Sequence, residues 1–313
     1  MGKPGLKRRI GGAITALVTP FRDGALDAVD LMVHAERQLL YGVDGLLACS
    51  LTGEGPTLTE AERTRIIEIC VELSEGRTPV IVATGTNDTA TTIEETLQAQ
   101  RLGADAALVT VPYYSKPTQK GVVHHFEQMA ARTGTPLIIH NQPSHTAIDL
   151  APATIARLAE IPGIVGIVDG SGDLQRIDLW RTLLPEWFGL YTSSDTGALA
   201  FTAAGGHGCF SNAANIVPRL FHSMHHSAAC GHLGAALSID ERLLPLFKAL
   251  ARESEPATVK HALALMKHME PEVRLPLFGV TAETAAEIET AIAPFQFDGS
   301  GRPNSHQSFR FGL

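Results

Sequence analysis

The residues with the clearest chemical potential lie in short loops that directly follow apolar segments. The stretch SLTGEG (50–55) offers the hydroxyl groups of Ser50 and Thr52, and Gly53 allows backbone amides to converge on an anion. Hydroxyl and amide donors of this kind can hold a small carboxylate. The same six residues could equally form a plain strand-to-helix turn, and the residues alone leave both interpretations open.

Two further loops carry groups that could move protons. The stretch HNQPSHT (140–146) contains His140 and His145, whose imidazoles have an ordinary pKa of about 6.5 and can transfer protons near neutral pH. The stretch PYYSKP (112–117) contains two adjacent phenols. Histidines are more often hydrogen-bonded structural residues than catalysts, and tyrosines often only pack. The functional interpretation therefore depends on where these loops lie.

The strands and helices expected between these loops predict where the loops lie in the fold. Apolar segments rich in β-branched residues alternate with segments of helical period, each switch marked by residues such as Gly, Pro or Asn. The strands are predicted at 13–19, 45–50, 79–84, 106–111, 136–141, 164–169, 188–192 and 207–211. One helix, 58–75, begins after the N-cap Thr59, with Glu62 completing a capping box. Strands that each precede a helix predict an α/β fold, a TIM (β/α)8 barrel.

The chain divides into four predicted parts. They are an N-terminal arm (1–12), the barrel (13–230), a small C-terminal helical extension (231–292) and a flexible tail rich in Gly, Ser and Pro (293–313). In such barrels the active site is built from the loops that follow the strands. The polar loops described above are therefore expected to meet at one mouth.

The composition argues against two classes of binding partner, nucleic acid and membrane. A formal charge of -8 and a pI near 5.9 disfavour binding to nucleic acid, and a mean hydropathy of +0.08 without a long apolar run disfavours a membrane span. The four cysteines show no CxxC spacing, which fits a reducing compartment. A cytoplasmic protein with a small-molecule ligand is expected.

Several stretches carry a family resemblance in their order and spacing. They are DGLLACSLTGE (44–54), GTNDTATTIE (85–94), VTVPYYSKPTQKG (109–121), NQPSHT (141–146) and GIVDGSGD (166–173). With these motifs the chain resembles the dihydrodipicolinate synthase / N-acetylneuraminate lyase family of pyruvate-dependent barrels. The resemblance implies a lyase or aldolase reaction on 2-keto acids. It also implies a homotetramer built from dimers, in which a tyrosine of the fourth loop enters the neighbouring subunit's pocket.

The chain departs from this family at the reactive centre. The resemblance implies a lysine at the end of the sixth strand that forms an imine with pyruvate, and Val168 occupies that place. Valine cannot add to a carbonyl, so the usual covalent chemistry is expected to be lost. Leu51 replaces a hydroxyl residue, His140 a proton-relaying tyrosine, and His145 an arginine that binds the second substrate's carboxylate in related synthases.

Other family positions are kept. Thr52 matches the family's carboxylate-binding threonine, and Tyr114 matches its relay tyrosine. Lys116 and Lys260 match family lysines, but neither is expected to supply the missing amine.

Three functions stay open. The first is a lyase, aldolase or hydratase that acts on a 2-keto acid or a similar small carboxylate without a lysine imine, with His140 and Tyr114 transferring protons. The second is a catalytically inactive paralogue that binds a ligand or regulates a partner subunit. The third is a metal-dependent aldolase with ligands from His140, Asp169 or Asp195.

A separate histidine cluster, FHSMHHSAACGH (221–232), could hold zinc through His222, His225 and His226. Its position after the last strand favours a solvated or subunit-facing side of a helix. No cofactor and no resident metal are therefore expected.

The candidate site residues follow from these arguments. The catalytic candidates are His140, Tyr114 and Thr52, and the substrate-binding candidates are Ser50, Gly53, Glu54, Asn141, His145, Val168, Asp169, Ser194, Asp195 and Ser211.

Overall fold

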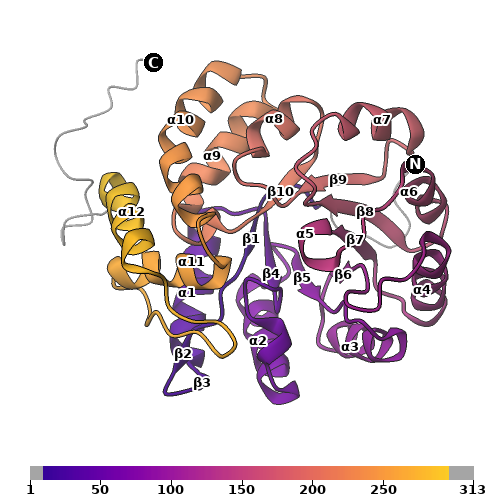
Figure 1. The fold of residues 1–313 in the computed structure, drawn as a ribbon, viewed down its shortest axis with the longest axis horizontal. Coiled ribbons are helices and arrows are strands. Elements are labelled where there is room, and N and C mark those ends of the chain that lie inside the picture. The colour runs from indigo at the N-terminus through magenta and orange to yellow at the C-terminus, as the bar shows by residue number, and fades with distance from the viewer. Residues whose placement is uncertain (1–9, 296–313) are drawn as a thin grey trace.

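The computed structural model describes residues 10–295, in which parallel strands close into a barrel (Figure 1). Each barrel strand pairs with the next one along the chain, and the first pairs with the last. The strands are β1 (Gly12–Ala16), β4 (Gly45–Ala48), β5 (Val80–Ala83), β6 (Ala106–Thr110), β7 (Leu137–Asn141), β8 (Ile164–Asp169), β9 (Gly189–Thr192) and β10 (Gly208–Ser211). The predicted TIM barrel is confirmed, and every predicted strand segment overlaps an observed strand.

Helices surround the barrel and connect its strands (Figure 1). They are α1 (Ala28–Leu40), α2 (Glu60–Ser74), α3 (Thr89–Arg101), α4 (Gln119–Arg132), the short α5 (Pro143–Thr146), α6 (Pro152–Ala159), α7 (Arg176–Leu183), α8 (Ala198–Ala203) and α9 (Pro218–Ala229). The predicted capping box of α2 is present, because Thr59 and Glu62 each bind the other's backbone amide.

Three further helices follow the barrel: α10 (Leu233–Leu250), α11 (Glu255–Leu265) and α12 (Ala282–Ile292). Phe247 of α10, Leu263 of α11 and Ile288 of α12 are buried in the same apolar cluster as strand residues Ala13 and Cys209. The C-terminal helices are therefore held against the side of the barrel formed by β1 and β10. Of the predicted arm and tail, residues 1–9 and 296–313 lie outside the described range.

A short hairpin precedes α1 and was not predicted. Strands β2 (Phe21–Arg22) and β3 (Ala25–Leu26) pair antiparallel around Asp23 and Gly24, both with positive φ. An Asp-Gly pair tolerates that backbone conformation. The hairpin places the Phe21 ring against the C-terminal segment. The guanidinium carbon of Arg274 lies 4.0 Å from the centroid of this ring.

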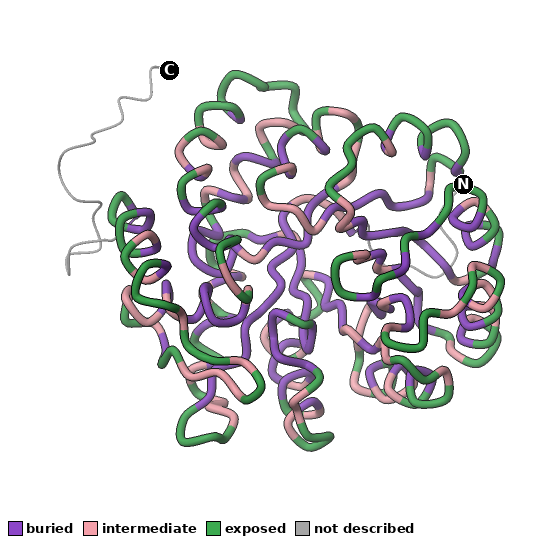
Figure 2. Tube along the Cα trace, in the orientation of Figure 1, coloured by how far each residue is buried: buried purple, intermediate pink, exposed green. Residues whose placement is uncertain are grey.

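The strands of the barrel consist largely of buried residues, coloured purple in Figure 2. Ile14, Leu47, Ile138, Val168 and Phe210 belong to one buried cluster. Because a packed interior leaves no room for a ligand, any site must lie at a mouth of the barrel.

Candidate active site

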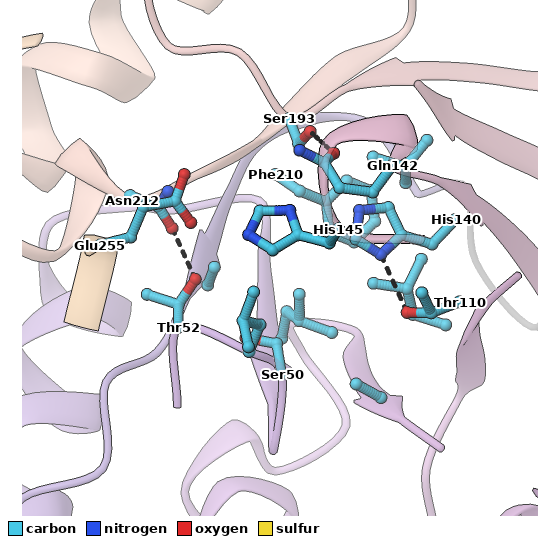
Figure 3. Close-up of a pocket in the computed structure, with 16 residues that line it drawn as sticks. Ser50, Thr52, Thr110, His140, Gln142, His145, Ser193, Phe210, Asn212 and Glu255 are labelled. Carbon is cyan, nitrogen blue, oxygen red and sulfur yellow. Dashed lines mark hydrogen bonds between the residues drawn. The ribbon is translucent and has the colours of Figure 1, made fainter. Parts of the chain in front are cut away.

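A pocket opens at the carboxyl ends of the strands, with a cavity of about 70 Å³ (Figure 3). Its apolar floor consists of Ala16, Leu47, Ala83, Leu108, Val168 and Phe210, together with Leu51 at the edge. Its polar wall consists of Ser50, Thr52, Thr110, His140, Gln142, His145, Ser193, Asn212 and Glu255. Polar groups from five strand ends or the loops after them, and from α11, thus converge over an apolar base.

His140 lies next to Val168 on the neighbouring strand, since the two residues are paired in the register of β7 and β8. Its Nδ1 is 3.0 Å from the hydroxyl oxygen of Thr110. Burial lowers the pKa of His140 to about 4, nearby His145 acts in the same direction, and Gln142 opposes them. The imidazole is therefore neutral at neutral pH, which is the form that can accept a proton.

The loop after β4 supplies two hydroxyl groups. Thr52 donates a hydrogen bond from Oγ1 to Oδ1 of Asn212 over 2.7 Å. The Ser50 hydroxyl is buried and has no hydrogen-bond partner within residues 10–295. Because Thr52 already donates its proton, Ser50 is the hydroxyl of this loop that is free to donate to a ligand.

Two other candidates of this loop do not line the pocket. Glu54 is fully buried, and its Oε1 accepts a hydrogen bond from Nζ of Lys260 over 2.5 Å. Its Oε2 accepts a hydrogen bond from the backbone amide of Arg274 over 2.8 Å. At Gly53, an added Cβ would lie 2.8 Å from the carbonyl oxygen of Leu17. Glu54 therefore holds the loop from behind, and Gly53 leaves room for the close approach of the Leu17 backbone.

Asn141 and Asp169 also lie behind the pocket wall. The Asn141 side-chain amide donates to the carboxylates of Asp169 over 2.8 Å and Asp149 over 3.0 Å. Asp169 further accepts a hydrogen bond from Ser171, and Asp149 is paired with Arg176. Burial raises the pKa of Asp169. This network joins the ends of β7 and β8 and is separate from the cavity.

A second cavity of about 210 Å³ adjoins the first and shares Gln142, Ser193, Asn212 and Glu255 with it. Two predicted residues, Ser194 and Asp195, line this outer cavity. Burial raises the pKa of Asp195 to about 6, while the Ser211 hydroxyl and backbone amides lower it in part. Ser211 itself is fully buried and lines neither cavity.

Tyr114 is the catalytic candidate that lies outside both cavities. The residue is 90% exposed, and its φ of 67° lies in the left-handed region. Thus His140, Thr52, Ser50, His145 and Val168 come together in one pocket, and Tyr114 does not reach it within this chain.

Five polar residues of the pocket were missing from the predicted site: Thr110, Gln142, Ser193, Asn212 and Glu255. Four of them occupy strand ends or the loops after them, which is a signal that could have found them. Glu255 follows no strand and is brought to the pocket by the packing of α11, so local sequence gives no sign of it.

The histidines of α9 are not arranged as a metal site. His222 lies 3.0 Å from a carboxylate oxygen of Asp44, and His225 lies 3.1 Å from the Thr202 hydroxyl. The predicted solvated face is wrong for His225, which is 2% exposed because α9 packs against α8. Within residues 10–295, no three His, Cys, Asp or Glu side chains are grouped so that they could hold a metal ion.

Known proteins are similar to this chain over nearly its whole length. The model of the dihydrodipicolinate synthetase family matches residues 9–294. A 4-hydroxy-tetrahydrodipicolinate synthase of Methylobacterium radiotolerans is 41% identical over 284 residues, which cover 91% of this chain and 95% of that protein. The synthase of Rhizobium meliloti is 41% identical over 282 residues, covering 90% of this chain and 97% of its own.

Solved structures of dihydrodipicolinate synthases are also similar to this chain. Dihydrodipicolinate synthase from Aquifex aeolicus superimposes with a TM-score of 0.88 at 36% identity, covering 91% of this chain and 98% of that one. The chloride-inhibited enzyme from Acinetobacter baumannii, complexed with pyruvate, gives 0.89 at 35% identity and covers 91% and 98%. Within the described residues, no helix is long and apolar enough to cross a membrane.

Proposed function

Because the chain belongs to the dihydrodipicolinate synthetase family, we propose that it is a lyase, aldolase or hydratase that works without a lysine imine. Its substrate in this proposal is a 2-keto acid or a similar small carboxylate. The observation that carries the proposal is Val168, a fully buried valine in the floor of the pocket next to His140. The family resemblance leads us to expect a lysine at that place.

The positions of the lysines support this proposal. None of the lysines within residues 10–295 lines the pocket. Lys260 is fully buried, with its ammonium group bound to Glu54 and to the carbonyl oxygen of Glu272. Lys116 is exposed on the loop after β6. No amine of the described chain is therefore available to add to a keto group in this pocket.

A proton transfer at carbon can proceed with the groups that remain. Aldol addition and dehydration of a 2-keto acid both involve removal of a proton near the keto group. In our proposal the neutral imidazole of His140 takes this proton, and the electron pair moves onto the keto oxygen to give an enolate. The Ser50 hydroxyl, with backbone amides of the loop 50–55, would hold the substrate's carboxylate or this oxyanion.

We assign Tyr114 to the same reaction only through a second copy of the chain. Its 90% exposed side chain supports a role at a subunit contact, where the phenol could enter a neighbour's pocket and relay a proton to or from His140. A homodimer or homotetramer is part of this proposal.

The proposal can be tested without knowing the second substrate. The protein is incubated with pyruvate in heavy water, and the exchange of the methyl protons for deuterium is followed by NMR. We expect exchange that is lost in His140→Ala, because the base is removed. It should be kept in His124→Ala, a control on the exposed face of α4 whose side chain is 63% exposed.

Other outcomes would favour other functions. Tight binding of 2-keto acids without exchange or product would indicate the inactive ligand-binding paralogue. Exchange that requires an added divalent metal and stops on chelation would indicate a metal-assisted reaction.

A further inference from the structure

The two joined cavities are lined by acidic and imidazole side chains. Their side chains include the carboxyl groups of Glu255 and Asp195 and the imidazoles of His140 and His145. Among the described residues that line either cavity there is no lysine or arginine. A substrate with two carboxylates would thus meet no permanent positive charge here, and it would face two acidic groups.

Glu255 stands at the boundary between the cavities, since it lines both of them. It is the first residue of α11, where the partial positive charge of the helix end favours a carboxylate. Figure 3 shows it beside Asn212, on the side of the pocket away from His140. Asn212 in turn accepts the hydrogen bond of Thr52. Glu255 therefore lies on the side of the pocket opposite the proposed base.

The charge state of Glu255 is set by opposing influences. Burial raises its pKa, whereas Asn212 and His145 lower it. A positively charged ligand group beside the carboxylate would lower the pKa further and form a charge-assisted hydrogen bond. A negatively charged ligand group would be repelled, or would require Glu255 to take up a proton.

From this placement we propose that Glu255 makes the site select substrates whose far end carries an ammonium group rather than a second carboxylate. The inference rests on the proposed function, in which the near end of the ligand is a carboxylate or keto acid held by the loop of Ser50, next to the base His140. The ammonium group would lie between Glu255 and the hydroxyl of Ser193, which lines both cavities as well. Selection arises from repulsion of the wrong end as much as from attraction of the right one.

Three linear five-carbon acids test this directly: 5-aminopentanoate, pentanoate and glutarate. They share one carboxylate and differ only at the far end, which is an ammonium group, a methyl group or a second carboxylate. Dissociation constants are measured by calorimetry at pH 8, above the ordinary pKa of imidazole. We expect 5-aminopentanoate to bind about 10-fold more tightly than pentanoate, and glutarate to bind most weakly.

Variants assign this order to Glu255. Glu255→Gln removes the charge with little change of shape and should bring the three constants within about 3-fold of one another. Glu255→Asp keeps the charge and should keep the order. Glu186→Gln is the matched control, because Glu186 is exposed and precedes β9 at the opposite end of the barrel. It should behave like the unaltered protein.

The results separate this inference from the proposed function. If the three acids bind equally well, or if Glu255→Gln keeps the order, the inference is wrong while a carboxylate site remains. If neither these acids nor pyruvate binds at all, the proposed function fails together with it.

Discussion

The two sides of the pocket differ in whether they carry charged side chains. Behind the loop after β4, Glu54 and Lys260 form an ion pair whose side chains are both 0% exposed. Across the pocket, the ends of β7 and β8 present a neutral His140 and the apolar Val168 to the cavity. Full charges therefore hold the loop after β4 from behind, whereas the ends of β7 and β8 present none to the inner cavity.

The charged side forms one connected assembly, which we call the buried frame: Phe21, Glu54, Glu62, Lys260 and Arg274. The ammonium group of Lys260 lies 4.2 Å from the centroid of the Phe21 ring, and the Arg274 guanidinium lies 4.0 Å from it. Arg274 is also paired with Glu62. The buried frame thus ties the loop 50–55 to α2, the hairpin and the C-terminal segment, which holds the pocket's hydroxyl groups in place.

The largest expected effect comes from breaking the buried frame. Lys260→Met leaves the Glu54 carboxylate buried without its cation, and loss of one partner of such a pair costs about 3–5 kcal/mol. The free energy of unfolding, measured by urea titration, should fall by that amount. Lys248→Met removes a lysine from the exposed side of α10 and should change it little.

The double variant Glu54→Gln/Lys260→Met sharpens this test. Because it removes both charges, it should recover part of the lost stability. A Lys260→Met protein as stable as the Lys248→Met control would contradict the role that we give to the buried frame.

A buried histidine away from the pocket, His34, should make the free energy of unfolding depend on pH. His34 is 2% exposed, and burial lowers its pKa from 6.5 to about 4. The unfolded chain therefore takes up a proton first as the pH falls. The stability from a neutral His34 is complete above pH 6.5 and is lost as the pH falls toward 4, by roughly 3 kcal/mol at most.

His34→Gln tests this dependence, because its amide can still donate to the Asn215 oxygen that lies 2.9 Å from His34 Nε2. Its free energy of unfolding should change less between pH 7 and pH 4.5 than that of the unaltered protein. The exposed control His124→Gln should keep the original slope. Equal slopes for all three proteins would show that His34 does not titrate as described.

The lowered pKa of His140 in the pocket should be visible by NMR. Burial lowers the pKa of His140 to about 4, so its ring resonance should titrate near that pH in NMR spectra. The assignment comes from the signal that is missing in His140→Gln. If His140 is the base, kcat/KM should fall on the acid side with a similar pKa. A ring that titrates above pH 6 would contradict this.

The smallest expected effect lies at the edge of the buried frame. Thr59→Ala removes the N-cap of α2 and one partner of Glu62, and it should lower the free energy of unfolding by about 1 kcal/mol. Thr290→Ala, in α12, is the control, since its hydroxyl only bonds back to the Ala286 carbonyl oxygen. A loss as large as that of Lys260→Met would mean that the Arg274–Glu62 contact depends on the cap.

Local patterns were enough to predict the barrel. Each strand is a short apolar segment with a turn signal near its end, and the α2 cap depends on residues three positions apart. The same logic placed His140 and Val168 at neighbouring strand ends, since parallel strands end at one mouth.

Contacts between distant segments could not be predicted in this way. Glu54 was expected to face substrate, but its partner Lys260 lies 206 residues further along the chain. Glu255 reaches the pocket only because α11 packs there, and His225 is buried because α8 covers it. The low pKa of His140 likewise depends on surroundings contributed by several strands.

Borohydride trapping would show directly whether this chain works without a lysine imine, as we propose. The protein is incubated with pyruvate and borohydride, and its intact mass is measured beside Val168→Lys and a lysine-bearing family member. We predict no adduct on the unaltered chain while the lysine-bearing relative is labelled. A stable pyruvate adduct on the unaltered chain would contradict the account, and peptide mapping would identify the lysine that carries it, with Lys116 as the first to examine.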